Sequence, residues 1–198
     1  MHFFRKFGNF GVSKLPAKFI TFFSYPQLDR QNSTILISEM LDTVDGLVVD
    51  SESGVFYWTD SGTKLISVST LDGKYTRILI WKDLLSPRSI ALNKKTSEIF
   101  WTDWGVRAAI EKSGKDGTGR KSIINTGLIW PNAITIDFER NKVVWADAYT
   151  KKLEISNFDG SGRKTLNQLL KHPFAITAFH GLIFLTDWEL STILKGSV

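Results

Sequence analysis

Phe56-Tyr57-Trp58-Thr59-Asp60 decides the fold of this chain, because variants of this stretch return three more times. They are Ile99-Phe100-Trp101-Thr102-Asp103, Val143-Val144-Trp145-Ala146-Asp147 and Ile183-Phe184-Leu185-Thr186-Asp187. Their central residues, at positions 58, 101, 145 and 185, are 43, 44 and 40 positions apart. This regular spacing indicates that the chain is built from repeated units.

Two further motifs keep the same period. An Asp-Gly pair follows the motif aspartate by 12 or 13 residues in three units, at Asp72-Gly73, Asp116-Gly117 and Asp159-Gly160. A proline followed by alternating apolar residues begins at Pro87, Pro131 and Pro173, and Asp45-Gly46-Leu47 takes the corresponding place in the first unit. A period of about 40 to 50 residues is typical of the blades of a β-propeller.

Each unit is predicted to contain four short strands. In the unit that begins at residue 85 we expect strands near 88–92, 98–103, 107–113 and 120–125, the first of which alternates as a strand does. The Asp116-Gly117 pair favours a hairpin turn between the last two strands, since glycine readily adopts positive φ. No stretch has a long helical period. The predicted fold class is therefore all-β, a propeller of four-stranded antiparallel blades.

The expected blades span approximately residues 42–84, 85–127 and 128–170, followed by a partial blade over 171–198. Residues 31–41 are predicted to be the last strand of an earlier blade. Propellers have roughly 4–8 blades and close on themselves, whereas this pattern stops inside a blade. We therefore expect residues 31–198 to form an incomplete propeller, about four blades of a larger ring.

Residues 1–30 do not follow the repeat. They carry a net charge of +4 out of the chain's +5, and they hold seven of its 14 phenylalanines. A signal peptide needs an uninterrupted apolar stretch, and Lys14 and Lys18 interrupt this one, so we interpret residues 1–30 as a segment outside the domain. Because the basic excess lies there and not in a patch on the domain, nucleic acid is not an expected partner. No apolar run approaches the ~20 residues of a membrane span.

The sequence offers little for catalysis. The absence of cysteine excludes thiol catalysis and cysteine metal sites, and no serine has a recognisable nucleophile setting. The motif tryptophans and aspartates recur once in every blade, which indicates a structural role, with the aspartates tying backbone groups between blades. We therefore expect no catalytic residues, no metal and no cofactor.

Strand direction identifies a candidate ligand-binding face. Successive strands run in opposite directions, so the loop after the second strand and the connection into the next blade open on one face, opposite the Asp-Gly turns. Tryptophan and arginine are common hot spots of protein interfaces, and an asparagine amide can pair two-sidedly with another amide. The candidate residues on this face are Asn132, Trp188, Arg88, Trp104, Trp130 and Asp45. For Trp130, packing between blades is the alternative.

Residues 31–198 resemble the YWTD β-propellers of the low-density lipoprotein receptor-related family. The resemblance is closest to the first propeller of the Wnt co-receptor, or Arrow-like, branch, and it rests on Trp130-Pro131-Asn132, Trp145-Ala146-Asp147-Ala148 and His172-Pro173-Phe174-Ala175. It implies a six-bladed propeller outside the cell that binds secreted proteins, namely Wnt proteins and Wnt antagonists, some of which present an Asn-X-Ile peptide. Attachment to the plasma membrane would depend on parts that this chain does not contain.

The resemblance also implies that Asn132, Arg88, Trp104, Trp188 and Asp45 match ligand-face positions. The chain departs from the family pattern where Leu185 replaces the motif tryptophan, where Ala146 replaces the threonine, and at Ser61-Gly62, which offers no tryptophan to the face.

Three other interpretations stay open. The first is an endocytic lipoprotein-receptor propeller with pH-dependent ligand release, which a titrating histidine at an interface would serve; His172 and His180 are the histidines of the domain. The second is an enzyme of the metal-centred propeller class, and the third is a non-functional gene fragment. Asn32-Ser33-Thr34 fits a glycosylation sequon, which matters only if the chain is secreted.

Overall fold

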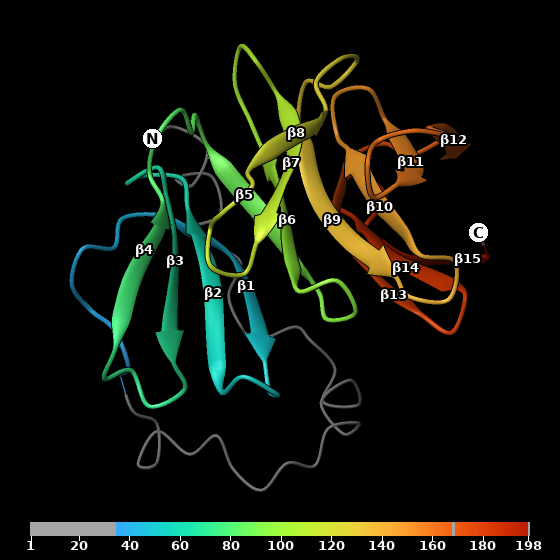
Figure 1. The fold of residues 1–198 in the computed structure, drawn as a ribbon. Helices are drawn as coiled ribbons and strands as arrows, with labels where there is room; N and C mark the ends of the chain where they lie inside the picture. The colour runs from blue at the N-terminus through green and yellow to red at the C-terminus, as the bar shows by residue number, and fades with distance from the viewer. Residues whose placement is uncertain (1–34, 168, 198) are drawn as a thin grey trace, which may run out of the picture. The chain divides into compact units, whose positions relative to one another are not determined.

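The computed structural model describes residues 35–167 and 169–197, so the expectations for residues 1–30 and for the Asn32 sequon lie outside the described residues. Within the described ranges, consecutive strands pair antiparallel into four sheets and no segment is helical (Figure 1). The predicted fold class, an all-β propeller with about four blades, is confirmed.

Each sheet is formed by strands that follow one another in the chain. The first contains β1 (Val44–Asp50), β2 (Val55–Asp60), β3 (Leu65–Thr70) and β4 (Thr76–Ile80). The second contains β5 (Pro87–Asn93), β6 (Glu98–Asp103), β7 (Ala109–Gly114) and β8 (Lys121–Ile124). The third contains β9 (Pro131–Asp137), β10 (Lys142–Asp147), β11 (Lys152–Asn157) and β12 (Lys164–Asn167). The fourth contains β13 (Pro173–Phe179), β14 (Leu182–Asp187) and β15 (Thr192–Ser197).

The first strands of the four sheets, β1, β5, β9 and β13, are neighbours in space. This is the radial arrangement of propeller blades, and each sheet is called a blade below. The blades pack face to face, so that a separate apolar core lies between each pair of neighbours.

In the second and third blades, the second strand, which carries the repeated motif, is covered on both of its faces. In β6, Ile99 and Trp101 pack into the core between the first and second blades, whereas Phe100 packs into the core between the second and third. All three side chains are fully buried. A strand with two buried faces gains nothing from polar alternation, which explains why the motif is a run of large apolar residues.

Leu185 stands in the fourth blade where the other blades have tryptophan. It is buried in a small core with Ala146 and Leu170. The departure from the motif therefore keeps the position apolar and buried, with a smaller side chain.

The Asp-Gly pairs form hairpin turns between the third and fourth strands, as predicted. Gly73, Gly117 and Gly160 have φ of 73°, 87° and 89°, the left-handed region that glycine enters without steric cost. At Gly160 a β-carbon would also collide with the carbonyl oxygen of Ile123. The turn in the third blade therefore requires glycine for two independent reasons.

Each motif aspartate fixes the loop that enters its own blade. Asp147 accepts hydrogen bonds from the N–H groups of Ile129 (2.7 Å) and Trp130 (3.1 Å) before β9, and from those of Tyr149 (3.0 Å) and Thr150 (2.9 Å) after β10. Two of the donors lie in the connection that enters the blade and two in the turn after β10, and none of the four lies in a strand of a neighbouring blade. The predicted ties between blades are thus ties to the connecting chain.

The strand expected over residues 31–41 is absent from the described part of that range. Residues 35–43 form no strand. Leu36–Leu41 instead line a groove together with Leu65 of β3 and Ile78 of β4, and the segment passes these strands in blue in Figure 1. A strand needs a hydrogen-bonded partner strand, and among the described residues no sheet precedes β1 to supply one.

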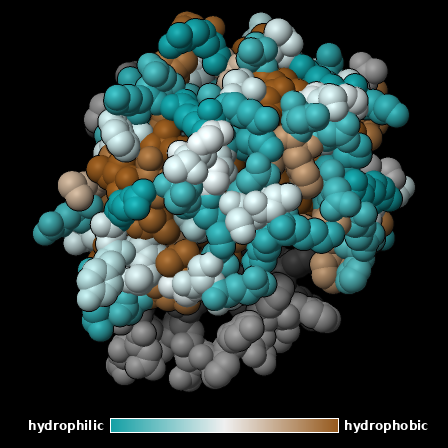
Figure 2. Space-filling view, in the orientation of Figure 1, coloured by the Kyte–Doolittle hydropathy of each residue, from teal (hydrophilic) through white to brown (hydrophobic). Residues whose placement is uncertain are grey.

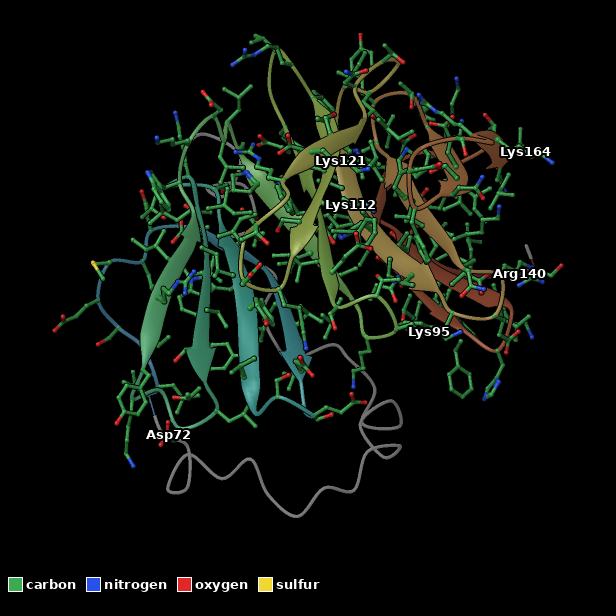
Figure 3. The ribbon with its side chains drawn as sticks, in the orientation of Figure 1. Asp72, Lys95, Lys112, Lys121, Arg140 and Lys164 are labelled. Atoms are coloured by element: carbon green, nitrogen blue, oxygen red, sulfur yellow. The ribbon has the colours of Figure 1, made fainter. Side chains whose placement is uncertain are left out.

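Polar side chains join neighbouring blades on the face that carries the hairpin turns. Nζ of Lys115 lies 2.8 Å from Oδ2 of Asp50 in the first blade, and Nζ of Lys95 donates to the carbonyl of Phe138 at 2.7 Å. Figure 3 labels Lys95 and Arg140 in two of these turns. The hydrogen bond from Lys115 lowers the pKa of the buried Asp50 carboxyl to about 2.

Asp50→Asn removes the charge that Lys115 faces and keeps the shape of the side chain. We expect the free energy of unfolding at pH 7 to fall by about 1 kcal/mol, because solvent around Lys115 screens the pair. The folded-state pKa is depressed, so the carboxylate stabilises fully above the unfolded value of about 3.9, and this stabilisation is lost as the pH falls toward 2. Urea unfolding between pH 7 and 2 measures this, and the free energies of unfolding of the wild type and of Asp50→Asn should become equal in acid.

Glu52→Gln is the matched control, because Glu52 is an exposed carboxylate in the turn that follows β1. A loss of stability as large as that of Asp50→Asn would contradict the assignment.

Candidate ligand-binding face

The loops that follow the second strands meet the connections that enter the blades. The N–H of Trp104 donates to the carbonyl of Ser86 at 3.0 Å, and the N–H of Trp188 donates to the carbonyl of His172 at 3.0 Å. The Asp-Gly turns lie at the other ends of the strands. The surface formed by these loops and connections is called the loop face below.

A row of side chains crosses the loop face from the first blade to the third. Nη2 of Arg88 lies 3.4 Å from Oδ1 of Asp45. The same guanidinium lies 4.1 Å from the ring centroid of Trp104, and Trp104 stacks on Trp130 with centroids 5.9 Å apart and an interplanar angle of 18°. Four of the six predicted site residues are therefore in one chain of contacts.

Trp130 lies on the surface and not wholly between the blades. It is 39% exposed, and its ring meets the edge of Tyr149 at a centroid distance of 5.1 Å. The indole N–H of Trp104 donates to the carbonyl of Pro131 at 3.0 Å, which holds Trp104 against the third blade. Tyr149 extends the row, although the sequence analysis did not select it.

Asn132 occupies a more enclosed place than the other predicted residues. It is 7% exposed, and its Nδ2 donates to the carbonyl of Pro173 in the fourth blade at 2.7 Å. Its buried Oδ1 has no hydrogen-bond partner among the described residues. Asn132 thus links two blades and also leaves one acceptor unused, which is unusual because buried polar atoms are normally paired.

Trp188 belongs to a second aromatic cluster in the fourth blade. It is 51% exposed, stacks on Phe174 with centroids 3.8 Å apart, and lies parallel to His172 with centroids 5.8 Å apart. Phe174 is the other residue that sequence reasoning missed. Its signal was its place directly after Pro173, because the first strand of each blade begins beside the loop face.

Burial and hydrogen bonding shift the pKa values of the aspartates beneath this face in opposite directions. Burial by itself would raise the pKa of Asp187, but N–H groups that include those of Lys171 and His172 lower it below its ordinary value. For Asp103 burial outweighs the bonds from Leu85 and Ser86, and the pKa is raised. Both carboxylates act as acceptors that shape the loops.

The first blade contributes a polar edge to the row instead of a tryptophan. Ser61 follows the motif aspartate there, and its hydroxyl donates to Oδ2 of Asp45. This contact leaves Asp45 held between Ser61 and Arg88. Among residues 35–167 and 169–197, no three metal-ligating side chains cluster, and that part of the chain has no helix long and apolar enough to span a membrane.

The radial blades, the Tyr-Trp-Thr-Asp-like central strands and the Asp-Gly turns define a β-propeller of the YWTD class. The family model described as low-density lipoprotein receptor repeat class B matches residues 54–92 and 97–138. Low-density lipoprotein receptor-related protein 5-like protein of Homo sapiens is 32% identical over 169 residues, which cover 85% of this chain and 67% of that protein. The chain belongs to the low-density lipoprotein receptor-related family.

Two insect receptors are similar over the same region. The vitellogenin receptor of Solenopsis invicta is 32% identical over 170 residues, covering 85% of this chain and 9% of the receptor. The vitellogenin receptor Yl of Drosophila melanogaster is 31% identical over 166 residues, covering 83% of this chain and 8% of the receptor. The chain thus spans only a small part of the length of these two receptors.

Solved structures show the same architecture. A chain in the crystal structure of a nidogen/laminin complex has a TM-score of 0.79 and 31% identity, and the match covers 83% of this chain and 63% of that chain. A virginiamycin B lyase from Staphylococcus aureus has a TM-score of 0.65 at 20% identity, covering 77% of this chain and 51% of that chain. The likeness to the lyase is one of fold alone.

Arg88→Ala removes both the ion pair with Asp45 and the contact with Trp104. We expect the free energy of unfolding to fall by about 1 kcal/mol, because partly exposed cation–π contacts and ion pairs are each worth roughly 0.5–1 kcal/mol. Iodide should also quench tryptophan fluorescence more strongly, since Trp104 loses its cover. Arg88→Lys keeps a cation, so its stability and its quenching should lie between those of the wild type and those of Arg88→Ala. If the alanine variant matched the wild type in stability and in quenching, Arg88 would not hold the row together.

Proposed function

We propose that the chain is an extracellular protein-binding propeller of a Wnt co-receptor-like protein. Its loop face would bind Wnt proteins or Wnt antagonists that present an Asn-X-Ile peptide. The observation that carries the proposal is the continuous row from Asp45 through Arg88 and Trp104 to Trp130. The receptor names of its relatives support a protein ligand.

The row has the composition of a protein interface. Interface hot spots are enriched in tryptophan, tyrosine and arginine, which combine a large apolar surface with polar edges. Mutual stacking holds the rings of Trp104 and Trp130 in place before any ligand arrives. Because little side-chain entropy is then lost on binding, such a platform favours affinity.

In this proposal Asn132 selects the ligand through a hydrogen bond. Its unpartnered Oδ1 would accept an N–H from the ligand, which satisfies a group that is otherwise left unpaired. Its Nδ2 already serves Pro173. Two-sided pairing with the asparagine of the ligand therefore requires the side chain to exchange that bond, a rotamer-scale adjustment of the kind that interfaces commonly make.

Asn132→Ala should weaken binding of an Asn-X-Ile peptide by about 1–3 kcal/mol, the cost of losing a buried hydrogen-bonding group. Trp188→Ala should weaken it by about 2 kcal/mol, as for a hot-spot aromatic. Isothermal titration calorimetry of the chain with the peptide measures both, and thermal unfolding of each variant shows that the fold is kept.

Tyr75→Ala is the control, because Tyr75 is an exposed aromatic residue in the turn after β3, on the opposite face. It should leave the affinity unchanged. Equal binding by the wild type and Asn132→Ala would refute the placement of the peptide at Asn132.

Binding, and not catalysis, is the role we infer, in agreement with the receptor relatives. The metal-centred enzyme stays the opposing hypothesis, and metal analysis of the purified chain decides between them. A stoichiometric bound ion would favour the enzyme.

A second candidate function is that of an endocytic receptor propeller that releases its ligand in acid; two of the relatives are named vitellogenin receptors. The observation that favours it is the stacking of His172 on the exposed Trp188. Histidine is the side chain that most often serves as a pH sensor in this range, and a ligand that packs on the Trp188 ring would also lie beside the His172 ring.

For this second function, the affinity of the loop-face ligand should fall several-fold from pH 7 to pH 5, and His172→Gln should remove most of the fall. Surface plasmon resonance at the two pH values measures both. His180→Gln is the matched control, since His180 lies in the turn between β13 and β14, on the opposite face. An affinity that does not change between pH 7 and 5 would count against acid release.

A further inference from the structure

An arginine closes the outer rim of the second blade. Nη2 of Arg120 lies 2.6 Å from Oε2 of Glu111, and its guanidinium carbon lies 5.7 Å from the ring centroid of Trp101. The same guanidinium donates to the backbone carbonyls of Lys82 and Asp83, in the connection that enters the blade. An indole, a carboxylate and two carbonyls thus surround one arginine.

The third blade repeats this arrangement. Nη2 of Arg163 lies 2.6 Å from Oε2 of Glu154, and its guanidinium carbon lies 5.4 Å from the ring centroid of Trp145. It donates to the carbonyls of Thr126 (2.6 Å) and Gly127 (3.4 Å). The repetition shows that this part of a blade has the right shape and polarity for a guanidinium.

The first blade keeps the tryptophan but lacks both members of the ion pair. The register partner of Trp58 is Ser67, whereas in the other two blades the register partner of the tryptophan is the glutamate. The arginine stands four residues after the turn aspartate in those blades, and Thr76 takes that position in the first. Two large charged side chains are therefore replaced by two small neutral ones.

The connection that supplies the carbonyls keeps its conformation in the first blade. Met40 has a φ of 56°, and the corresponding Asp83 and Gly127 have φ of 54° and 64°. Two and three residues after Met40, the N–H groups of Asp42 and Thr43 donate hydrogen bonds to the motif aspartate Asp60, as their counterparts do in the other blades. Glu39 and Met40 therefore correspond to the residues whose carbonyls hold the arginine elsewhere.

A groove of about 340 Å³ lies where the ion pair is missing. Trp58 and Ser67, which are 5% and 4% exposed, form its floor, and Glu39, Met40 and Thr76 also line it. Figure 2 shows hydrophobic surface over the outer strands β3 and β4 of this blade. None of the six loop-face candidates lines the groove.

We propose that this groove is a binding site for an arginine side chain of a protein partner. The guanidinium takes the place that Arg120 and Arg163 fill in their own blades, over the indole of Trp58 and against the backbone of Glu39 and Met40. The inference stands apart from the proposed function, because it uses a different part of the propeller.

Arginine fits this groove better than lysine for physical reasons. Its planar fork can donate to two carbonyls at once and can lie over an aromatic ring, whereas the lysine ammonium is a compact, strongly hydrated charge. The carboxylate of Glu39 gives the groove a negative charge in place of the missing glutamate. Because Glu39 is exposed, one arginine alone should bind weakly, with millimolar affinity.

The test titrates the full chain, labelled with ¹⁵N, with N-acetyl-arginine methylamide and separately with the lysine analogue. The indole N–H resonance of Trp58 is identified by its loss in Trp58→Phe. We expect this resonance to shift with the arginine probe and to shift several-fold less with the lysine probe. Equal responses to the two probes, or no response to either, would overturn the proposal.

Rebuilding the ion pair provides the decisive variant. Ser67→Glu combined with Thr76→Arg should fill the groove from within, abolish the response of Trp58 and raise the midpoint of thermal unfolding. Thr76→Arg alone should also abolish the response, which keeps the test independent of the folding of the double variant. Thr76→Ser, the conservative control, should keep it. A response that survives in both filled variants would refute the site.

The chain's own arginines outside the described residues are tested in the same way. If the groove responds to the probe only after Arg5→Ala and Arg30→Ala, one of these side chains is its occupant, and the proposal of an outside partner is overturned.

Discussion

The burial of the central strands β6 and β10 on both of their faces is the constraint on which the rest of the structure depends. In β6, alternate residues supply the cores on either side of the second blade. The spacing and orientation of the blades follow from this packing, because each strand must fit two neighbours at once. Large side chains suit such a position, since an aromatic residue buries the most area. In the fourth blade one face of β14 is buried, through Ile183 and Leu185, and the other face is half-buried.

The loop face is built at the ends of these central strands. A motif aspartate at the end of each central strand collects N–H groups from the entering connection and from the following loop, as Asp147 does. Two segments far apart in the sequence are thereby held together on one face. The side chains that stand on these fixed loops, such as Trp104 and Trp130, are free to differ from blade to blade, and this freedom allows the loop face to carry a specific site.

The first blade shows how a departure from a repeat can create a new feature. Its Ser61 gives the row a polar end where the second and fourth blades offer Trp104 and Trp188. On its outer strands, Ser67 and Thr76 leave open the groove that an ion pair closes in the next two blades. At the groove the connection keeps the backbone conformation of the other blades, and the side chains differ. The groove also lies on the face of the first blade that no preceding blade covers among the described residues.

The sequence by itself determined the blade architecture. The period of the motif gave the order of the strands, and the strand expected over 98–103 is β6, because a buried apolar run with an Asp-Gly turn after it is a local signal. It also predicted which residues share the loop face, since strand direction follows from strand order. Over residues 35–41, the described part of the strand expected at 31–41, the prediction was wrong, because a strand depends on a partner that local sequence does not reveal.

Only the tertiary structure decided what those residues do on the face. Asn132 donates to Pro173, 41 positions away, and Trp104 of the second blade stacks on Trp130 of the third. Burial and stacking depend on how neighbouring blades pack, and no periodicity within one blade contains that information. The physical reason is that a repeat encodes the fold through contacts at a fixed spacing, whereas a binding site is assembled from residues that the packing of different repeats brings together.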